Sequence, residues 1–369
     1  MIDNFPLYEE LLQRNLVEIE PADFLYSSPS CLPTGMDFDR VAGMMLGLAI
    51  GDALGNTTES MLPANRRQQF GEIRDYLPNK YAGYRNEGLP SDDSQMAFWT
   101  LEQLAIDGGL IPENLANVFS QKKIFGIGKT VKDFIYSYHY QGKTWFTAGQ
   151  PSAGNGSLMR IAPMLIPHLR QPSSGLWMDT ILSGMITHND RAANASNVAY
   201  INILWECLKL IRPPDAVWWV EAFTAVAKQL EGNTAYLPRH DGVLHSGPLW
   251  QFIDREVHQE LRDSRPTLDA CERWHSGAYL LETIPCVLYI LARHGNDPEQ
   301  AIIRAVNDTK DNDTIAAIVG AAVGALHGKT AFPKRWLDGL SGRTEADDDG
   351  HIFDVIEEAK RVFWQEYYS

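Results

Sequence analysis

Apolar residues recur at positions i, i+3 and i+4 from about residue 38 to residue 328, which places them along single faces of helices. Runs in which apolar and polar residues alternate, as in a half-buried strand, are few. Gly, Pro, Asn and Asp punctuate the pattern at plausible helix ends. We therefore predict an all-α protein with helices over residues 38–54, 92–105, 112–120, 131–138, 177–185, 193–210, 216–230, 249–261, 278–293, 298–307 and 313–327.

Small residues dominate the stretch 315–325, which consists of Ala, Gly, Ile and Val. Small side chains let helix backbones approach one another closely, so this stretch is typical of a central helix with close neighbours. A chain of 369 residues with 44% hydrophobic residues can also bury a large core, which excludes wholesale disorder. Length alone allows either several domains or one large enzyme body.

The charge balance excludes several classes of function. A net charge of −15 argues against broad contact with a nucleic-acid backbone, which requires clustered Lys and Arg. The longest uncharged runs, 41–51 and 314–328, are shorter than the roughly 18–20 residues of a membrane span. The acidic start of the chain does not resemble a secretory signal, so we expect a cytoplasmic protein. The four cysteines are too scattered to indicate disulfides or a zinc site.

The two ends of the chain differ from this body. Residues 1–35 are acidic and rich in Pro, with one short amphipathic stretch at 7–16, and we interpret them as an extension preceding a domain over residues 36–369. Near the other end, the acidic run 345–350 begins like a calcium loop. Ile356 stands where a bidentate acid should close such a loop, so a solvated acidic loop is favoured.

Common catalytic motifs are absent. Three Gly-Lys-Thr triplets, at 128–130, 142–144 and 328–330, lack the preceding Gly of a phosphate-binding loop. Neither Gly-x-Ser-x-Gly nor His-Glu-x-x-His occurs, which removes the simplest serine-hydrolase and zinc-protease interpretations.

Carboxylates gather instead at the starts of two predicted helices. Ser91, Asp92 and Asp93 precede one apolar run, and the segment 310–314, with Asp311, Asp313 and Thr314, precedes another. Each cluster alone is more simply explained as a helix cap that compensates the helix dipole. Together they offer the hard oxygen ligands that suit Mg²⁺ or Mn²⁺. Glu59, after the Gly-rich segment 51–55, is a third acidic candidate.

Five segments together resemble one family. Gly-Asp-Ala-Leu-Gly at 51–55 with Glu59, Ser-Asp-Asp-Ser-Gln-Met at 91–96, Gly-Asn-Gly-Ser-Leu-Met-Arg at 154–160, Thr-His at 187–188 and Asp-Asn-Asp-Thr-Ile-Ala at 311–316 occur in the order seen in ADP-ribosylglycohydrolases. The chain is identified as a member of this family, of the dinitrogenase-reductase-activating glycohydrolase type, over about residues 36–330.

The resemblance implies a compact all-α domain with two Mg²⁺ or Mn²⁺ ions in a central cleft, hydrolysing the N-glycosidic bond between ADP-ribose and a protein side chain. The implied metal ligands are Ser91, Asp92, Asp93, Asp311, Asp313 and Thr314. Family members usually have Thr at the position of Ser91, and Ser retains the hydroxyl group. They commonly have Gly-Gly in place of Thr309-Lys310, which leaves the substrate choice open.

The resemblance, together with the chemistry of the substrate, implies further roles. Asp92 or Asp93 is expected to assist proton transfer, and Glu59 is expected to be a gating or metal-proximal acid rather than an ordinary helix-end carboxylate. The pyrophosphate of ADP-ribose needs local compensation in an acidic protein, which Asn155, Gly156 and Ser157 could supply through their amides, together with Arg160. His188 is either a ligand-binding residue or a hydrogen-bonding loop residue.

Two functions in different classes stay open. One is an ADP-ribosylarginine hydrolase acting on modified proteins, with arginine favoured over serine only by resemblance. The other is a binding or immunity module with little or no catalysis. The extension is similar to that of bacterial immunity hydrolases, in which it plugs an ADP-ribosyltransferase toxin, so we predict that residues 1–35 block such a toxin while the body hydrolyses. The alternatives are a housekeeping hydrolase without a toxin partner, and an extension that is a strap on its own domain or a disordered tail.

Overall fold

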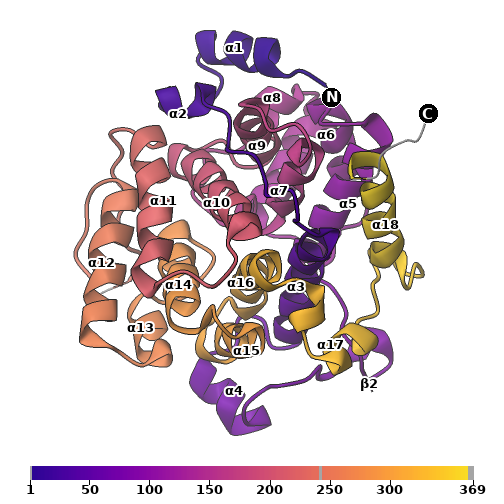
Figure 1. Cartoon of the computed structure of the whole chain (residues 1–369), viewed down its shortest axis with the longest axis vertical. Helices are drawn as coiled ribbons and strands as arrows, with labels where there is room; N and C mark the ends of the chain where they lie inside the picture. The colour runs from indigo at the N-terminus through magenta and orange to yellow at the C-terminus, as the bar shows by residue number, and fades with distance from the viewer. Residues whose placement is uncertain (1, 241–242, 365–369) are drawn as a thin grey trace.

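The protein is built almost entirely of helices. The computed structural model describes residues 2–240 and 243–364. Within them the sheet is a two-stranded antiparallel hairpin of β1 (Pro78–Asn79) and β2 (Arg85–Asn86), with Pro78 opposite Asn86. Figure 1 shows the helices arranged around a central pair, α3 and α16. The predicted all-α class is confirmed.

Each helix predicted from periodicity is present, with ends shifted by a few residues. The α-helices run over α1 Phe5–Gln13, α2 Asp23–Tyr26, α3 Phe38–Asn56, α4 Pro63–Phe70, α5 Asp92–Asp107, α6 Pro112–Gln121, α7 Lys129–Ile135, α8 Trp145–Ala148, α9 Gly175–Met185, α10 Arg191–Lys209, α11 Ala216–Leu230, α12 Leu249–Asp263, α13 Thr267–Arg273, α14 Leu280–His294, α15 Pro298–Asp308, α16 Asn312–His327, α17 Lys334–Gly339 and α18 His351–Phe363. Tighter or wider turns occupy Lys80–Ala82, Tyr136–Tyr140, Leu158–Arg160, Ala162–His168 and Lys329–Ala331.

Helix α18 lies directly after the acidic run and was not predicted. Its apolar residues, among them Ile352, Val355 and Ile356, are buried at helical spacing. Ile356 is therefore a core residue. The acidic run itself is closed by its own hydrogen bonds, because Asp348 accepts from the backbone amides of Thr344 and Glu345.

The central pair meets through glycine. Helices α3 and α16 run antiparallel, and a Cβ atom placed on Gly47 would lie 2.1 Å from the carbonyl oxygen of Gly320. Gly43 meets Gly324 and Gly51 meets Ala316 in the same way. We call Gly43, Gly47, Gly51, Gly320 and Gly324 the glycine seam. Only residues without a Cβ allow this approach, so the seam fixes how the two backbones align.

The seam determines where three helix ends meet. Because α3 and α16 are antiparallel, the C-terminal part of α3 lies beside the N-terminus of α16, with Gly55 packed against Asp313. Helix α5 begins at the same place, since the backbone amide of Ser91 donates to Asp52 of α3. The two predicted carboxylate clusters are thereby brought together from distant parts of the sequence.

Residues 2–35 pack on the body as a strap. Tyr8, Leu11 and Leu25 are fully buried. Asn4 donates to Asp179 of α9 (2.7 Å), and the indole of Trp177 donates to the carbonyl of Ser27 (2.7 Å). Figure 1 shows α1 and α2 lying over the end of the bundle near α9 and α10. In this structure the extension therefore packs as a strap on its own domain, which is one of the alternatives considered from the sequence.

The strap should contribute measurably to stability. We expect Leu11→Ala to lower the free energy of unfolding by about 2–5 kcal/mol, because it removes a fully buried side chain. The matched control is Glu10→Ala on the exposed face of the same helix, with an expected change within about 0.5 kcal/mol. Urea unfolding measures both. Equal, small effects of the two variants would instead indicate a tail that does not contribute to the fold.

No helix within the described residues has both the length and the apolar character needed to cross a lipid bilayer.

Candidate metal centre

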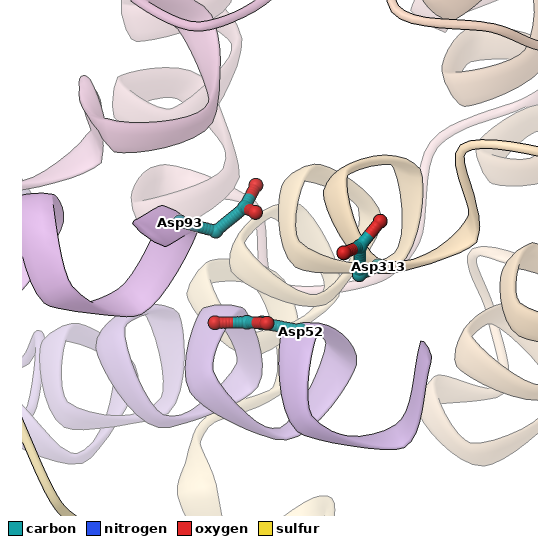
Figure 2. A group of neighbouring side chains, drawn as sticks. All are labelled: Asp52, Asp93 and Asp313. Carbon is teal, nitrogen blue, oxygen red and sulfur yellow. The ribbon is translucent and has the colours of Figure 1, made fainter. Parts of the chain in front are cut away.

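Three buried aspartates converge at the meeting point of α3, α5 and α16. Asp52, Asp93 and Asp313 each present a carboxylate oxygen within 4.8 Å of the others. Figure 2 shows them projecting toward one space from three separate helices. Like charges this close and this buried repel one another strongly unless protons or a cation compensate them. The arrangement therefore fits a divalent cation.

A second group adjoins the first. Glu59, Asp311 and Asp313 also have carboxylate oxygens within 4.8 Å of one another. Asp313 belongs to both groups, and Glu59 is the exposed member. Two groups that share one carboxylate have the donor set for two neighbouring ions.

Asp52 lies in the Gly-Asp-Ala-Leu-Gly motif, but the sequence predicts no role for it. Its carboxylate accepts hydrogen bonds from the amide of Ser91 (2.9 and 3.0 Å), and from the amide (3.0 Å) and hydroxyl (2.5 Å) of Ser94. It thus satisfies free amides at the first turn of α5 from another helix. Asp52 holds the start of α5 in place. Because Asp52 and Ser91 are 39 positions apart, local sequence patterns do not predict this contact.

The hydroxyls of both predicted clusters turn toward Asp93. Ser91 donates to its Oδ2 atom (2.9 Å), and Thr314 lies 3.4 Å from the same atom. The other oxygen, Oδ1, is buried and has no hydrogen-bond partner among the described residues. A buried, unpartnered carboxylate oxygen beside two other carboxylates is the kind of donor a hard cation requires.

Asp92 lies outside both groups. It is the first residue of α5, is partly buried, and has its Oδ1 atom close to Gly126. Burial, followed by the nearby charge of Asp52, raises its pKa to about 7. A carboxyl group with a pKa near neutrality that is not held by neighbouring donors is suited to proton transfer.

A buried arginine fixes the geometry of the second group. The guanidinium of Arg66 on α4 donates to the hydroxyl and carbonyl of Thr58 and to the carbonyl of Thr309 (2.8 Å). Thr58 precedes Glu59, and Thr309 lies just before Asp311. Arg66 therefore joins the two loops that carry these acids.

The pKa values of the whole cluster are shifted in one direction. Burial, followed by the charges of neighbouring carboxylates, raises the pKa of Asp93 and Asp313 well above the ordinary value. Burial raises the pKa of Asp311 to about 7, although Asn155 donates to it. Without a metal, the cluster therefore holds protons near neutral pH that the unfolded chain would release.

This difference predicts the pH dependence of the metal-free protein. Between pH 6.5 and about 8, Asp92 and Asp311 lose protons in the folded state only, so the free energy of unfolding should fall by on the order of 1 kcal/mol as pH rises. His188, whose pKa burial lowers to about 3, opposes this fall near pH 6.5, because the unfolded histidine still binds protons there and the folded one does not; the opposition fades as pH rises to 8. Thermal unfolding in chelator measures the effect. Stability rising over this range, or an unchanged slope in Asp311→Asn, would contradict the assignment.

The Gly-Asn-Gly segment lies beside the carboxylates. The side chain of Asn155 donates to Asp311 (2.6 Å) and to Thr283 (3.0 Å). Gly156 faces the ring of His188, and a Cβ atom there would lie 2.8 Å from its Cε1 atom. The predicted residues Asn155, Gly156 and His188 are thus brought together next to the candidate metal centre.

His188 is buried and neutral. Its Nδ1 atom lies 2.9 Å from the hydroxyl of Thr187, and its Nε2 atom faces Gly154. Burial, together with the charge of Arg160, lowers its pKa. A cavity of about 370 Å³ adjoins this segment and is lined in part by Pro151 and Tyr236.

Two other residues of this segment face the interior. Ser157 is fully buried, and its hydroxyl pairs with Asn197. The guanidinium of Arg160 is also fully buried, where it donates to Ser183 and Thr187 and lies over the ring of Phe119. The sequence indicated Arg160 as a phosphate-binding candidate, but these contacts give its side chain a structural role.

Comparison with known proteins places these features in context. The model of the ADP-ribosylglycohydrolase family matches residues 34–366. The ADP-ribosylarginine hydrolase Tri1 of Pseudomonas putida is 27% identical, over 86% of this chain and 80% of its own. The ADP-ribosyl-[dinitrogen reductase] glycohydrolase of Rhodospirillum rubrum is 27% identical, over 84% and 92%. A solved ADP-ribosylglycohydrolase-related protein complex superimposes with a TM-score of 0.63 at 25% identity, covering 88% of this chain and 97% of the other.

Proposed function

Because the chain belongs to the ADP-ribosylglycohydrolase family, we propose that it removes ADP-ribose from arginine side chains of modified proteins with the help of two divalent ions, Mg²⁺ or Mn²⁺. The observation that carries this proposal is the pair of carboxylate groups sharing Asp313. The arginine linkage is supported by the similarity to relatives named as ADP-ribosylarginine hydrolases.

The proposed ligands are Asp93, Asp311 and Asp313, with Glu59 closing the second group and the hydroxyls of Ser91 and Thr314 beside Asp93. Bound ions would supply Lewis-acid polarisation and would orient the ribose hydroxyls. Asp52 belongs to the first group, but both of its carboxylate oxygens already accept hydrogen bonds from Ser91 and Ser94, so its proposed role is to hold the start of α5. Arg66 holds the two acid-bearing loops.

Asp92 is the residue that we propose for proton transfer. Cleavage breaks the bond between the anomeric carbon and the guanidine nitrogen, and water supplies the new hydroxyl on the sugar. Asp92 would take a proton from that water and return one to the leaving nitrogen, a role that its pKa of about 7 allows in both directions. Asn155 and His188 would line the sugar side, with His188 acting as a neutral hydrogen-bonding group.

The test is release of ADP-ribose from a protein modified on arginine, compared with the same protein modified on serine. We expect release from the arginine-linked substrate with Mg²⁺ or Mn²⁺ and none in excess chelator. Release that persists in chelator would contradict the metal proposal. Release from serine alone would overturn the linkage but leave the hydrolase assignment in place.

Neutralisation of an ADP-ribosyltransferase toxin by residues 1–35, and a cytoplasmic location, stay predictions. Tyr8, Leu11 and Leu25 are buried against the body of the protein. A toxin that binds the strap in this conformation would therefore contact the exposed face of the strap. Phe5 and Tyr26, which pack edge to face there, are its large exposed apolar side chains within the described residues. Loss of binding to an arginine-specific transferase in a Phe5→Ala, Tyr26→Ala variant would support this role, and unchanged binding would count against it.

A further inference from the structure

Basic and imidazole side chains gather beside the acidic cluster. The Nζ atom of Lys310 lies 3.3 Å from the Nε2 atom of His275, whose ring stacks on that of His240 at 5.2 Å. The guanidinium of Arg239 lies 4.2 Å from the centre of the Tyr279 ring. We call Arg239, His240, His275 and Lys310 the basic rim. All four are exposed or partly exposed, in a chain whose net charge is −15.

The basic rim is joined to the candidate metal centre through the backbone. The amides of Lys310 and Asp311 donate to the hydroxyl and carbonyl of Ser276 (3.0 and 2.9 Å). Tyr279 bridges to Gly154, at the start of the Gly-Asn-Gly segment. The segment 275–279 therefore runs between the candidate metal centre and the Gly-Asn-Gly segment, and Lys310 and Arg239 contact its two ends.

Two consecutive residues of this segment have unfavourable backbone conformations. His275 and Ser276 both have positive φ values, 67° and 42°, which residues other than glycine seldom adopt. Such strain persists where surrounding contacts hold it, and it is concentrated at functional sites. Here the contacts are those of Ser276 with the 310–311 backbone.

The positive charges of the rim are available to a ligand. Among the described residues, no carboxylate oxygen lies within 4.0 Å of the Lys310 ammonium or the Arg239 guanidinium. Burial, the largest effect, lowers the pKa of His275; the buried carboxylate of Glu282 raises it, and the charges of Lys310 and His240 lower it. His275 is thus favoured in its neutral form, which can accept a hydrogen bond from Lys310.

We propose that Lys310 and Arg239 bind the pyrophosphate of ADP-ribose, with His275 and His240 orienting Lys310. This inference rests on the proposed function and extends it to the residues that set affinity for the nucleotide. Lysine provides a point charge and arginine a two-pronged donor for phosphate oxygens. Lys310 directly precedes Asp311, and Arg239 lies over Tyr279, whose backbone bridges to Gly154, so one cation adjoins the candidate metal centre and the other adjoins the Gly-Asn-Gly segment.

The test separates the nucleotide from the protein part of the substrate. Lys310→Ala and Arg239→Ala are compared with Arg262→Ala, an exposed arginine of α12 that contacts Gln259. Two quantities are measured for each: kcat and KM for ADP-ribose release, and the affinity for ADP by calorimetry in the presence of Mg²⁺. We expect each rim variant to raise KM and the Kd for ADP about tenfold, with a smaller effect on kcat, and Lys310→Arg to restore most of the affinity.

The outcomes distinguish this inference from the proposed function. Unchanged ADP affinity in both rim variants overturns the inference, and if KM alone rises, the basic rim contacts the protein part of the substrate instead. ADP affinity that falls in the rim variants upholds the inference even if the wild-type protein releases no ADP-ribose, in which case only the proposed function fails. A wild-type protein that binds no ADP overturns the inference.

Discussion

Replacing Asp313 by alanine is expected to reduce ADP-ribose release by about a thousandfold, equivalent to about 4 kcal/mol of transition-state stabilisation. Asp313 is the carboxylate shared by both acidic groups, so its loss removes a donor from each of the two proposed ions. The effect should be visible in kcat and in the number of Mn²⁺ ions bound, measured by calorimetry.

Stability provides the control for this experiment. Removing one of several crowded, buried carboxylates relieves repulsion, so metal-free Asp313→Ala should unfold at the same or higher denaturant concentration than the wild type. Asp254→Ala, an exposed carboxylate on α12, should change neither activity nor ion binding. If Asp313→Ala kept full activity and bound two ions, the shared-ligand assignment would be wrong.

Replacing Gly47 by valine is expected to prevent the protein from reaching its native packing, with a loss of at least about 3 kcal/mol in the free energy of unfolding. A Cβ atom at this position would lie 2.1 Å from the backbone oxygen of Gly320, and a backbone atom cannot move aside as a flexible side chain can. Urea unfolding and the near-ultraviolet circular dichroism of the buried tryptophans measure the loss.

The matched control is Gly35→Ala. Nothing lies within 4 Å of a Cβ atom at Gly35, and its φ angle is not positive, so a change within about 0.5 kcal/mol is expected. A Gly47→Val protein that unfolded like the wild type would show that α3 and α16 can separate without loss, contrary to the seam.

Local patterns predicted the helices well because each has its own periodic apolar face, as α10 and α11 illustrate. They failed for α18, whose apolar positions, among them Ile352 and Val355, directly follow an acidic run that is typical of a solvated loop. The two carboxylate clusters were recognisable because helix starts favour Ser and Asp.

Contacts between residues far apart in the chain could not be predicted from the sequence. Asp52 meets Ser91 and Ser94 across 39 and 42 positions, and Arg66 reaches Thr309 across 243. No periodicity or spacing reports such pairs. The sequence also could not decide what covers the apolar residues of the extension. They could pack in a groove of a partner or on the body of this protein, and the burial of Tyr8 and Leu11 shows that they pack on the body.

The glycine seam also has a consequence for how the protein is made. Gly55 and Asn312, which are hydrogen-bonded at its end, are 257 positions apart. At a synthesis rate of about 5–20 residues per second, roughly 10–50 s pass between the emergence of α3 and that of α16. During this time the face of α3 that packs on α16 is uncovered and is open to chaperones or aggregation. The metal centre is therefore among the last parts of the nascent chain to assemble.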